Sequence, residues 1–351
     1  MECLAIGSLP YNNPKDALLT VQNYFYNIPF WPQLAKVSKN EDMTIQFLEG
    51  MPSFFISEDC DFAFDTENEK FFEDLEQFFI DYEEIIGNNN NELLEKYAIS
   101  ENFSSAFGPF LNLIKNCKCK YAKGQIVGPF TLATTLTDKK GRCAIYDDTL
   151  REIIVKTLSL KALWQIKKIK EADAVPIIFI DEPSISQLGT SAYLTVSQGE
   201  VVSMLKEIAE IIKNNGGLSA IHCCGKCDWS VPIKTGINII SLDAYAYAQN
   251  LSIFHNDVKN FLENGGKIAW GVVPTLDREA LEKADLNLIL KKFDKAVNYL
   301  TKKGINEKLI IENSLVTPSC GAGSLSEELA EKAMKLTREL CESLKERYND
   351  N

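Results

Sequence analysis

The chain has 351 residues, of which 37 are Lys or Arg and 49 are Asp or Glu, so its formal net charge at neutral pH is −12. This charge argues against a general nucleic-acid or anionic-membrane binder, and no apolar run is long enough to span a membrane. Because the N-terminus also lacks a basic-then-apolar leader, we expect a cytoplasmic protein. Its ten cysteines are then expected to be metal ligands, nucleophiles or core residues rather than disulfides.

The acidic residues are concentrated in one segment near the N-terminus. Residues 41–101 contain 18 acidic side chains and only two basic ones, Lys70 and Lys96, a local charge of −16 that leaves +4 for the rest of the chain. The segment also contains nine phenylalanines, which is too aromatic for a solvated acidic tail. We therefore predict a folded insertion over about 41–110, with a helix at 67–86 and a break at the four asparagines that follow.

Short apolar runs alternate with longer helical patterns along the chain, which is typical of repeated βα units and a parallel sheet. The predicted strands are 3–9, 124–127, 177–180, 218–221, 237–242, 267–270 and 309–311, and an eighth is expected within 50–110. The predicted helices are 147–172, 198–214, 252–263, 277–303 and 326–347. The sequence thus predicts an α/β protein with one domain over 1–351, a (β/α)8 TIM barrel with an acidic, aromatic N-terminal insertion.

An open doubly wound sheet is the alternative fold. It would be favoured by a glycine-rich phosphate loop after the first strand, but residues 6–10 are Ile-Gly-Ser-Leu-Pro and do not match G-x-G-x-x-G. Nearly every predicted strand is instead followed by polar or reactive side chains. In a barrel, these side chains would surround one mouth at the carboxyl ends of the strands, where active sites lie.

The clearest chemical pattern at these strand ends is a candidate zinc site. His222 and Cys224 are two residues apart, which places an imidazole and a thiolate on one face, and this donor set suits Zn²⁺. Cys320, after the last strand, can supply a third ligand, and three protein ligands with an open position are typical of catalytic zinc. Two alternatives remain at this point: a closed structural site that includes the neighbouring Cys223 and Cys227, and no metal.

The other cysteines, at 3, 60, 117, 119, 143 and 341, have no partner pattern and are expected to be core residues or exposed thiols.

Four motifs together resemble a known superfamily. They are residues 128–133 (GPFTLA), 180–183 (IDEP), 222–225 (HCCG) and 318–321 (PSCG). In this order they resemble the superfamily of uroporphyrinogen decarboxylase, cobalamin-independent methionine synthase and the methylcobamide:coenzyme M methyltransferases. The resemblance runs from about residue 4 to the C-terminal helix and implies a (β/α)8 barrel. In the methyltransferase branches, a zinc ion held by His-x-Cys and a distal Cys binds the acceptor thiol, which implies those roles for His222, Cys224 and Cys320.

Arginine content separates the branches of this superfamily. The decarboxylases hold a porphyrinogen that bears many carboxylates, and they use an arginine-rich N-terminal loop to do so. This chain has five arginines, and none precedes residue 142. We therefore expect a zinc-dependent methyltransferase that acts on a thiol. A decarboxylase-like lyase and a non-catalytic corrinoid-binding protein are the alternatives.

The resemblance also implies substrate residues. In the synthases, the Ile-Gly-Ser of the first strand and the Asp of the fourth hold the amino-acid end of homocysteine, which implies that role for Ile6, Gly7, Ser8 and Asp181. Asp181 suits an ammonium group and would repel the sulfonate of coenzyme M, so homocysteine is favoured over coenzyme M. Asp243 matches the acidic fourth zinc ligand of the synthases, although their residue is glutamate, and we expect Asp181 and Asp243 to be catalytic.

One substrate residue of the synthases has no clear match in this chain. The synthases have a substrate glutamate in a His-Gly-Glu run, which this chain lacks, although residues 41–43 (EDM) resemble the end of that run.

The resemblance also implies a methyl donor. Single-barrel relatives take the methyl group from a methyl-corrinoid, usually presented by a separate protein, which implies a corrinoid donor and a corrinoid protein as partner. Trp229 and Tyr245 are expected at the rim, where they would contact such a macrocycle, and core packing is the alternative for both.

Overall fold

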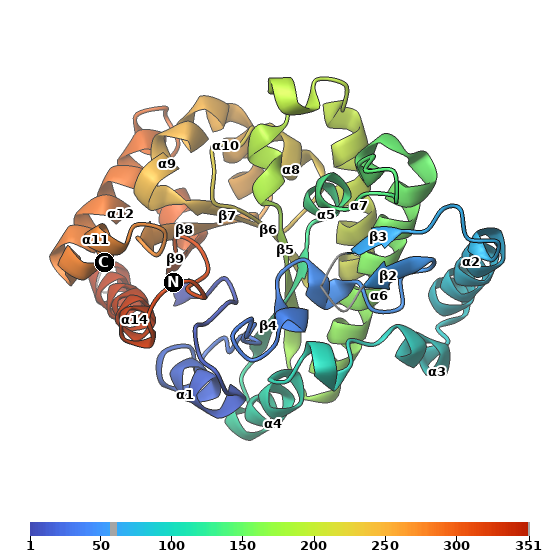
Figure 1. The fold of residues 1–351 in the computed structure, drawn as a ribbon. Coiled ribbons are helices and arrows are strands. Elements are labelled where there is room, and N and C mark those ends of the chain that lie inside the picture. Colours follow the sequence, from blue (N-terminus) through green and yellow to red (C-terminus); the bar gives the residue numbers. More distant parts are fainter. Residues whose placement is uncertain (57–61, 350–351) are drawn as a thin grey trace.

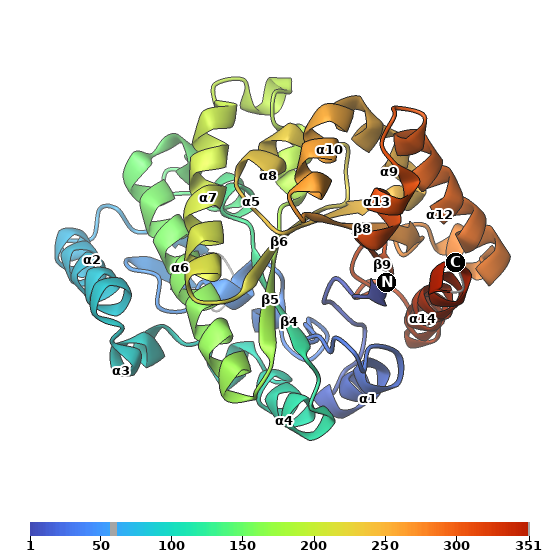
Figure 2. The same ribbon diagram turned by 180° about the vertical axis from the view of Figure 1, so that it is seen from behind.

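A computed structural model describes residues 1–56 and 62–349. Its centre is a seven-stranded sheet with the order β1-β9-β8-β7-β6-β5-β4, in which every neighbouring pair is parallel. Helices surround this sheet on its outer side (Figures 1 and 2). The strands are β1 (Glu2–Cys3), β4 (Tyr121–Val127), β5 (Val175–Asp181), β6 (Leu218–Cys223), β7 (Ile239–Asp243), β8 (Lys267–Val273) and β9 (Ser314–Pro318).

The strands form because their apolar runs are buried on both faces, as in other parallel sheets. Alternate residues face inward and form a small apolar cluster that includes Ile177, Phe179, Ala220, Ile239 and Ala269. The residues between them pack outward against the helices in the main hydrophobic core. The inner cluster fills the interior near the amino ends of the strands, so that polar side chains at the carboxyl ends are left to line a site.

The helices begin at recognisable caps. Asp147 accepts a hydrogen bond from Leu150 N at the start of α6, and Ser197 and Glu200 form a capping box at the start of α7. The helices around the sheet are α1 (Pro14–Tyr24), α4 (Phe107–Cys117), α5 (Pro129–Thr135), α6 (Asp148–Glu171), α7 (Gln198–Asn214), α8 (Ser230–Lys234), α9 (Ala244–Leu251), α10 (His255–Glu263), α11 (Arg278–Lys283), α12 (Leu286–Thr301), α13 (Glu307–Glu312) and α14 (Glu327–Asn349). None of the described helices is long and apolar enough to cross a membrane.

Three predicted elements differ from the structure. The predicted strand 309–311 is wrong because these residues belong to α13, whose first turn is capped by the Asn306 side chain. The strand follows at Ser314–Pro318. The predicted helix 277–303 is two helices, since Asp285 adopts extended backbone and caps α12. The first strand is shorter than 3–9, because the chain beyond Leu4 turns toward Gln33, whose amide donates to the Gly7 carbonyl.

The eighth strand expected within 50–110 is also wrong. This region contains β2 (Phe54–Ile56) and β3 (Phe62–Phe64), which pair antiparallel with each other outside the main sheet. Between β1 and β4 lies instead the segment 29–33, which makes isolated parallel bridges from Phe30 to Lys123 and from Gln33 to Ser8. Two of its residues, Pro29 and Pro32, have no amide N–H to donate, which limits it to bridges. The parallel α/β sheet is confirmed, but the named strands do not form a complete eight-stranded barrel.

The acidic segment contains the predicted helix and lies outside the ring of helices. The helix is α2 (Phe71–Asn88), and it is followed by Asn89 in a left-handed conformation and by α3 (Asn91–Leu94). Phe71, Phe78 and Ile85 of α2 are buried, whereas Phe72 is exposed. Figure 1 shows α2 and α3 at one edge of the molecule. Residues 57–61, with Cys60 and three of the acidic residues, lie outside the described part of the chain.

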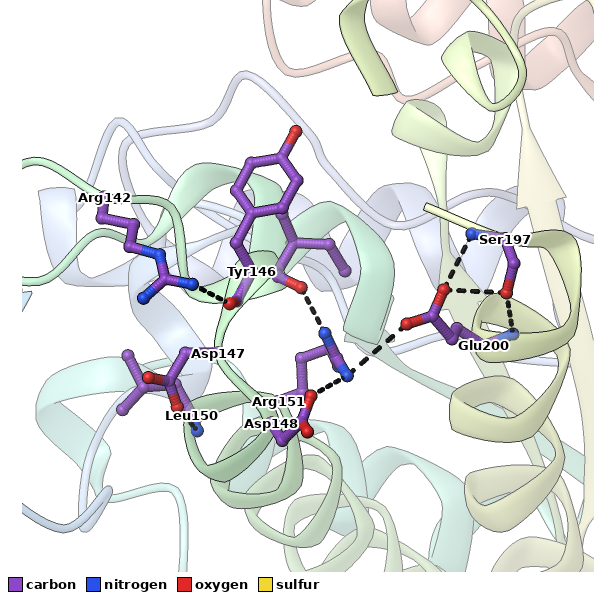
Figure 3. A network of polar contacts seen from close by, with 9 residues as sticks. Arg142, Tyr146, Asp147, Asp148, Leu150, Arg151, Ser197 and Glu200 are labelled. Carbon is purple, nitrogen blue, oxygen red and sulfur yellow. Dashed lines mark hydrogen bonds and ion pairs between the residues drawn. The ribbon is translucent and has the colours of Figure 1, made fainter. Parts of the chain in front are cut away.

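A polar network fastens the segment after α5 to the next two helices (Figure 3). Arg151 of α6 donates to the Ile145 carbonyl at 2.6 Å and pairs with Asp148 on its own helix and with Glu200 of α7. Arg142 donates to the Tyr146 carbonyl. These contacts are mostly exposed, so each contributes little alone, but together they fix the loop that leads from α5 to α6.

Candidate metal and substrate site

Three soft ligand atoms converge at the carboxyl ends of the strands. One ring nitrogen of His222 and the Sγ atoms of Cys224 and Cys320 all lie within 4.8 Å of one another. His222 is on β6, and Cys224 follows that strand directly. Cys320 follows β9, which is three positions away from β6 in the sheet. Within residues 1–56 and 62–349, this is the one group of three or more such side chains close enough to share a metal ion. The structure therefore brings together the three residues that the sequence predicts as zinc ligands.

The imidazole of His222 is held in a defined orientation. Its side chain is buried, and Nδ1 lies 3.1 Å from the hydroxyl oxygen of Ser241 on the neighbouring strand β7. Its other nitrogen, Nε2, is buried and has no hydrogen-bond partner in the described protein. A histidine that donates one N–H to a protein acceptor presents a lone pair on the other nitrogen, as metal-binding histidines do.

The two cysteines of the group shift each other's pKa in opposite directions. A hydrogen bond from the Cys320 thiol, assisted by His222, lowers the pKa of Cys224 to about 4 although burial opposes this shift. The same hydrogen bond, together with burial, raises the pKa of Cys320. Cys224 is thus the more acidic thiol of the pair, and a bound cation would stabilise its thiolate.

The backbone of Cys320 is held at both ends by one side chain. The hydroxyl of Thr275, which follows β8, accepts a hydrogen bond from the Cys320 amide at 2.9 Å and donates to the Cys320 carbonyl at 2.9 Å. The Thr275 amide also donates to Ser319 Oγ at 3.1 Å. The third ligand is therefore placed by a clamp between the ends of β8 and β9, although it lies about a hundred residues from the other two in sequence.

The closed local site is not formed. Cys223 and Cys227 are 0% and 2% exposed and belong to the hydrophobic core on the outer side of the sheet, away from the group of three. Burial and the neighbouring Cys223 raise the pKa of Cys227 well above its usual range, so both behave as apolar core residues.

A cavity of about 320 Å³ opens beside the three ligand atoms. It contains two carboxylates, Asp42 and Asp181, and none of its lining residues is a lysine or arginine. The complete lining is Ile6, Ser8, Gln33, Ala35, Asp42, Met43, Asp181, Pro183, His222, Cys224, Leu276, Cys320, Gly321, Gly323 and Ser324. The cavity is therefore acidic, with aliphatic walls, and suits a small ligand that carries a positive charge.

Asp181 is the buried carboxylate of this cavity. It is the last residue of β5, stands in register with His222, and is 6% exposed. Its Oδ1 atom has no hydrogen-bond partner in the described protein. Burial raises the pKa of Asp181, while the positive charges of Lys123 and His222 oppose that shift. A buried carboxylate oxygen without a partner is costly, and a ligand ammonium would satisfy it.

The remaining residues predicted for the site have different positions. Asp243 ends β7, but its carboxylate caps α9 by accepting from Ala246 N at 2.9 Å, and it is not in the metal group. Burial raises the pKa of Asp243 to about 6. Trp229 is 1% exposed in the hydrophobic core, and Tyr245 packs under Lys292, whose Nζ is 3.7 Å from the ring centroid. Neither aromatic residue lines the cavity. Trp229 is packed in the core and does not lie at the rim, where it was expected to contact a macrocycle.

Of the residues predicted to bind the amino-acid end of the substrate, Ile6 and Ser8 line the cavity, whereas Gly7 between them does not. Sequence reasoning missed Gln33, which lies in the proline-containing segment beside β4, and gave Asp42 no role. The resemblance of residues 41–43 to the end of the synthases' His-Gly-Glu motif was the one indication that this region belongs to the site. The structure places Asp42 and Met43 on the cavity wall.

Two of the four sequence motifs meet in one structural joint. The carboxylate of Glu182 is fully buried and accepts hydrogen bonds from Phe130 N at 2.8 Å, Thr131 N at 2.9 Å and Thr131 Oγ1 at 2.6 Å. It thereby caps the amino end of α5 from the neighbouring strand connection, as a negative charge at that end of a helix should. Its neighbour Gly128 has no room for a side chain, since a Cβ there would lie 2.0 Å from Glu182 Cδ.

Glu182 should make stability depend on pH. Burial raises its pKa from 4.5 to about 7 in the folded protein. Between these two values the folded state binds the proton more tightly than the unfolded state does, so the free energy of unfolding should fall as pH rises from about 4.5 to about 7, by up to about 3 kcal/mol. Urea unfolding across this range tests the slope. Glu182→Gln should flatten it, and an equally steep slope in the variant would contradict the assignment.

Ser241→Ala should weaken metal binding without removing it. The change deletes the oxygen that orients His222 but leaves all three ligand atoms, and loss of such a supporting contact typically costs about 10- to 100-fold in metal affinity. Competition with a chromogenic zinc chelator measures the change. Ser219→Ala, on the same sheet but bonded to Asn238 near the amino end of β6, is the matched control and should bind zinc like the wild type.

Comparisons with known proteins were made at the level of sequence and of structure. No protein-family model and no curated protein matches the sequence. Among solved structures, the chain is similar to a Listeria monocytogenes protein with the provisional name of a vitamin-B12-independent methionine synthase. The two are 14% identical with a TM-score of 0.49, and the match covers 99% of this chain and 98% of that one. At this identity and TM-score the likeness carries no argument about activity, which must come from the site itself.

Proposed function

We propose that the protein is a zinc-dependent methyltransferase that transfers a methyl group to the sulfur of a small, amine-bearing thiol, with homocysteine as the favoured acceptor. One observation supports this most strongly. A histidine nitrogen and two cysteine sulfurs lie within 4.8 Å of one another on the wall of a cavity that also contains the unpartnered carboxylate of Asp181.

The residues present fit a zinc ion. One imidazole and two thiol sulfurs are a borderline-soft donor set, His222 Nε2 is buried without a protein partner, and a fourth position would face the cavity. His222, Cys224 and Cys320 would hold the ion. Zinc bound there would stabilise a thiolate at neutral pH, which makes a thiol nucleophilic without a separate general base.

The charge of the cavity favours an acceptor with an ammonium group. Asp181 and Asp42 contribute negative charge, and none of the residues that line the cavity is a lysine or arginine. The sulfonate of coenzyme M or the carboxylates of a porphyrinogen would be repelled, whereas the ammonium of homocysteine would pair with Asp181. A methylcobamide:coenzyme M-type activity and a decarboxylase-like activity are therefore less well supported than thiol methylation of an amino acid.

The transfer itself is a displacement at carbon. The acceptor thiol gives up its proton, its sulfur forms a bond to the methyl carbon, and the bond between that carbon and the donor breaks with its electron pair left on the donor. The protein's part is positioning, because Asp181 would fix the acceptor's amino end while the apolar Met43, Pro183 and Leu276 line the cavity around it. Asp243, bonded to the α9 backbone, has no direct part in this scheme.

The donor we propose is a methyl-corrinoid, free or presented by a corrinoid protein. A cavity of about 320 Å³ is at the small end of ligand pockets and has room for the acceptor but not for a macrocycle. The macrocycle would therefore lie over the mouth, where Leu276 is 57% exposed. A methyl-folate is the alternative donor.

The assay for this proposal supplies zinc-loaded protein with one donor and one acceptor at a time. Donors are methylcobalamin and methyltetrahydrofolate, and acceptors are homocysteine and coenzyme M. We expect methionine from methylcobalamin and homocysteine, and much slower methylation of coenzyme M. Tight corrinoid binding without methylation of either thiol would support the non-catalytic alternative and overturn the proposal. Cys227→Ala, which changes a core cysteine outside the site, should remain active.

A further inference from the structure

A buried lysine lies among the apolar side chains on the inner side of the sheet. Lys123 of β4 is 0% exposed, and its ammonium group is 4.4 Å from the centroid of the Phe179 ring in the inner apolar cluster. It donates hydrogen bonds to the Ile6 carbonyl and to Gln125 Oε1, the latter at 3.0 Å. Both partners are uncharged. Burying a lysine in this way is costly, and the reaction scheme above assigns no task to it.

The two partners of Lys123 both act on the chain at residues 6–8. Ile6 is held directly through its carbonyl. Gln125 lies against Gly7, because a Cβ at Gly7 would be only 3.1 Å from Gln125 Oε1, and the other end of the Gln125 amide donates to the Trp31 carbonyl at 3.1 Å. Gly7 has a φ of 154°. Lys123 is thus the common anchor of a buried network that sets the path of residues 6–8.

That path matters because it borders the cavity and offers free donors. Ile6 and Ser8 line the cavity. Within the described part of the chain, the amides of Gly7 and Ser8 donate to no other residue. Of these two residues only Ser8 lines the cavity, so its amide is the donor that can reach a ligand there. A free N–H group on the cavity wall suits the carboxylate of a ligand.

We propose that Lys123 is a positioning residue that holds residues 6–8 in place to bind the carboxylate end of the acceptor, while Asp181 binds its ammonium end. This inference rests on the proposed function in that the acceptor is an amino-acid thiol. Lys123 does not line the cavity and does not touch the reacting sulfur. Its effect should therefore appear in the affinity for ligands that carry a carboxylate, and not in zinc content or in affinity for ligands that lack one.

The chain offers a matched control for this test. Lys161 of α6 is also 0% exposed, and its ammonium group donates to the Tyr97 and Ala98 carbonyls at 2.9 Å each. It fastens the acidic segment to α6 and does not line the cavity. Lys123→Met and Lys161→Met thus remove the same group from equally buried places with the same number of hydrogen bonds, so both should lower thermal stability.

The experiment compares two thiols by calorimetric titration of the zinc-loaded, full-length proteins. Homocysteine has the carboxylate, and 3-aminopropanethiol is the same molecule without it. For Lys123→Met we expect homocysteine affinity to fall about 10-fold or more, which is the loss of one charge-assisted contact, with 3-aminopropanethiol affinity and zinc content unchanged. Lys161→Met should bind both thiols like the wild type. Lys123→Gln, which keeps an amide donor, should lie between Lys123→Met and the wild type.

Several outcomes would overturn the inference. Unchanged homocysteine affinity in Lys123→Met would do so, and so would an equal loss for both thiols, which would mean general loosening of the cavity. If Lys123→Met does not fold, the same comparison in Lys123→Gln decides. A wild-type protein that binds neither zinc nor homocysteine would instead contradict the proposed function, so the two failures are distinguishable.

Discussion

Replacing Asp181 with asparagine is expected to raise the KM for homocysteine by about 100-fold while kcat changes less than about 10-fold. The substitution keeps the size of the side chain but removes the charge that pairs with the acceptor's ammonium group. In a buried site a charge-assisted hydrogen bond is worth roughly 2–3 kcal/mol, which corresponds to about 30- to 150-fold in affinity. Asp181 is 6% exposed and has an unpartnered oxygen, so water compensates little for the loss.

Initial-rate kinetics at saturating donor measure this effect, with zinc content determined on the same preparations. Asp42→Asn is the graded comparison, because Asp42 also lines the cavity but already accepts a hydrogen bond from Thr44 N at 2.9 Å, so its effect should be smaller. A fall in kcat with unchanged KM would place Asp181 in the chemical step instead. Loss of zinc from Asp181→Asn would mean that it supports the metal.

Gly128→Ala is expected to reduce the free energy of unfolding by about 3 kcal/mol or more, because there is no room for a methyl group. The added Cβ would lie 2.0 Å from Glu182 Cδ and 2.1 Å from its Cγ. Glu182 cannot swing away at low cost, since three hydrogen bonds hold its carboxylate on the first turn of α5 and the side chain is fully buried.

Urea denaturation gives the stability of Gly128→Ala, with the slope of the transition used to check that the unfolded state is unaltered. Gly87→Ala is the control. Gly87 lies near the end of α2, and a Cβ added there would have no neighbour within 4 Å, so alanine should be neutral or stabilise by up to about 1 kcal/mol. Stability of Gly128→Ala within about 1 kcal/mol of the wild type would show that the joint between α5 and β5 is looser than described.

Much of the sheet could be predicted from sequence because a parallel strand buried on both faces is an almost continuous apolar run. Residues 177–180 and 218–221 are such runs and are strands. The run 309–311 is just as apolar, but three residues do not distinguish a strand from a helix, and the cap at Asn306 makes it helical. The segment 29–33 could not be predicted as part of the sheet, since its two prolines are typical of a loop.

The site was predictable where spacing alone decides geometry. His222 lies on β6 and Cys224 directly follows that strand, so their proximity is local, whereas the approach of Cys320 depends on the curvature of the sheet and on the Thr275 clamp. An aspartate after a strand can act in the site or cap the next helix, and sequence does not distinguish the two, which is why Asp243 is expected to be catalytic from the sequence although its carboxylate caps α9. Trp229 illustrates the same limit, because an aromatic residue near a rim can equally turn into the core.

The most direct test of the central claim is the metal content of purified protein, measured by mass spectrometry on wild type, His222→Ala and Cys320→Ala. The account predicts about one zinc ion per wild-type chain and loss of zinc in both variants, because removing one of three protein ligands leaves too few to hold the ion. Cys227→Ala, which alters a buried cysteine three residues from Cys224, should keep its zinc. Zinc retained at full stoichiometry in Cys320→Ala, or absent from the wild type after reconstitution, would contradict the account.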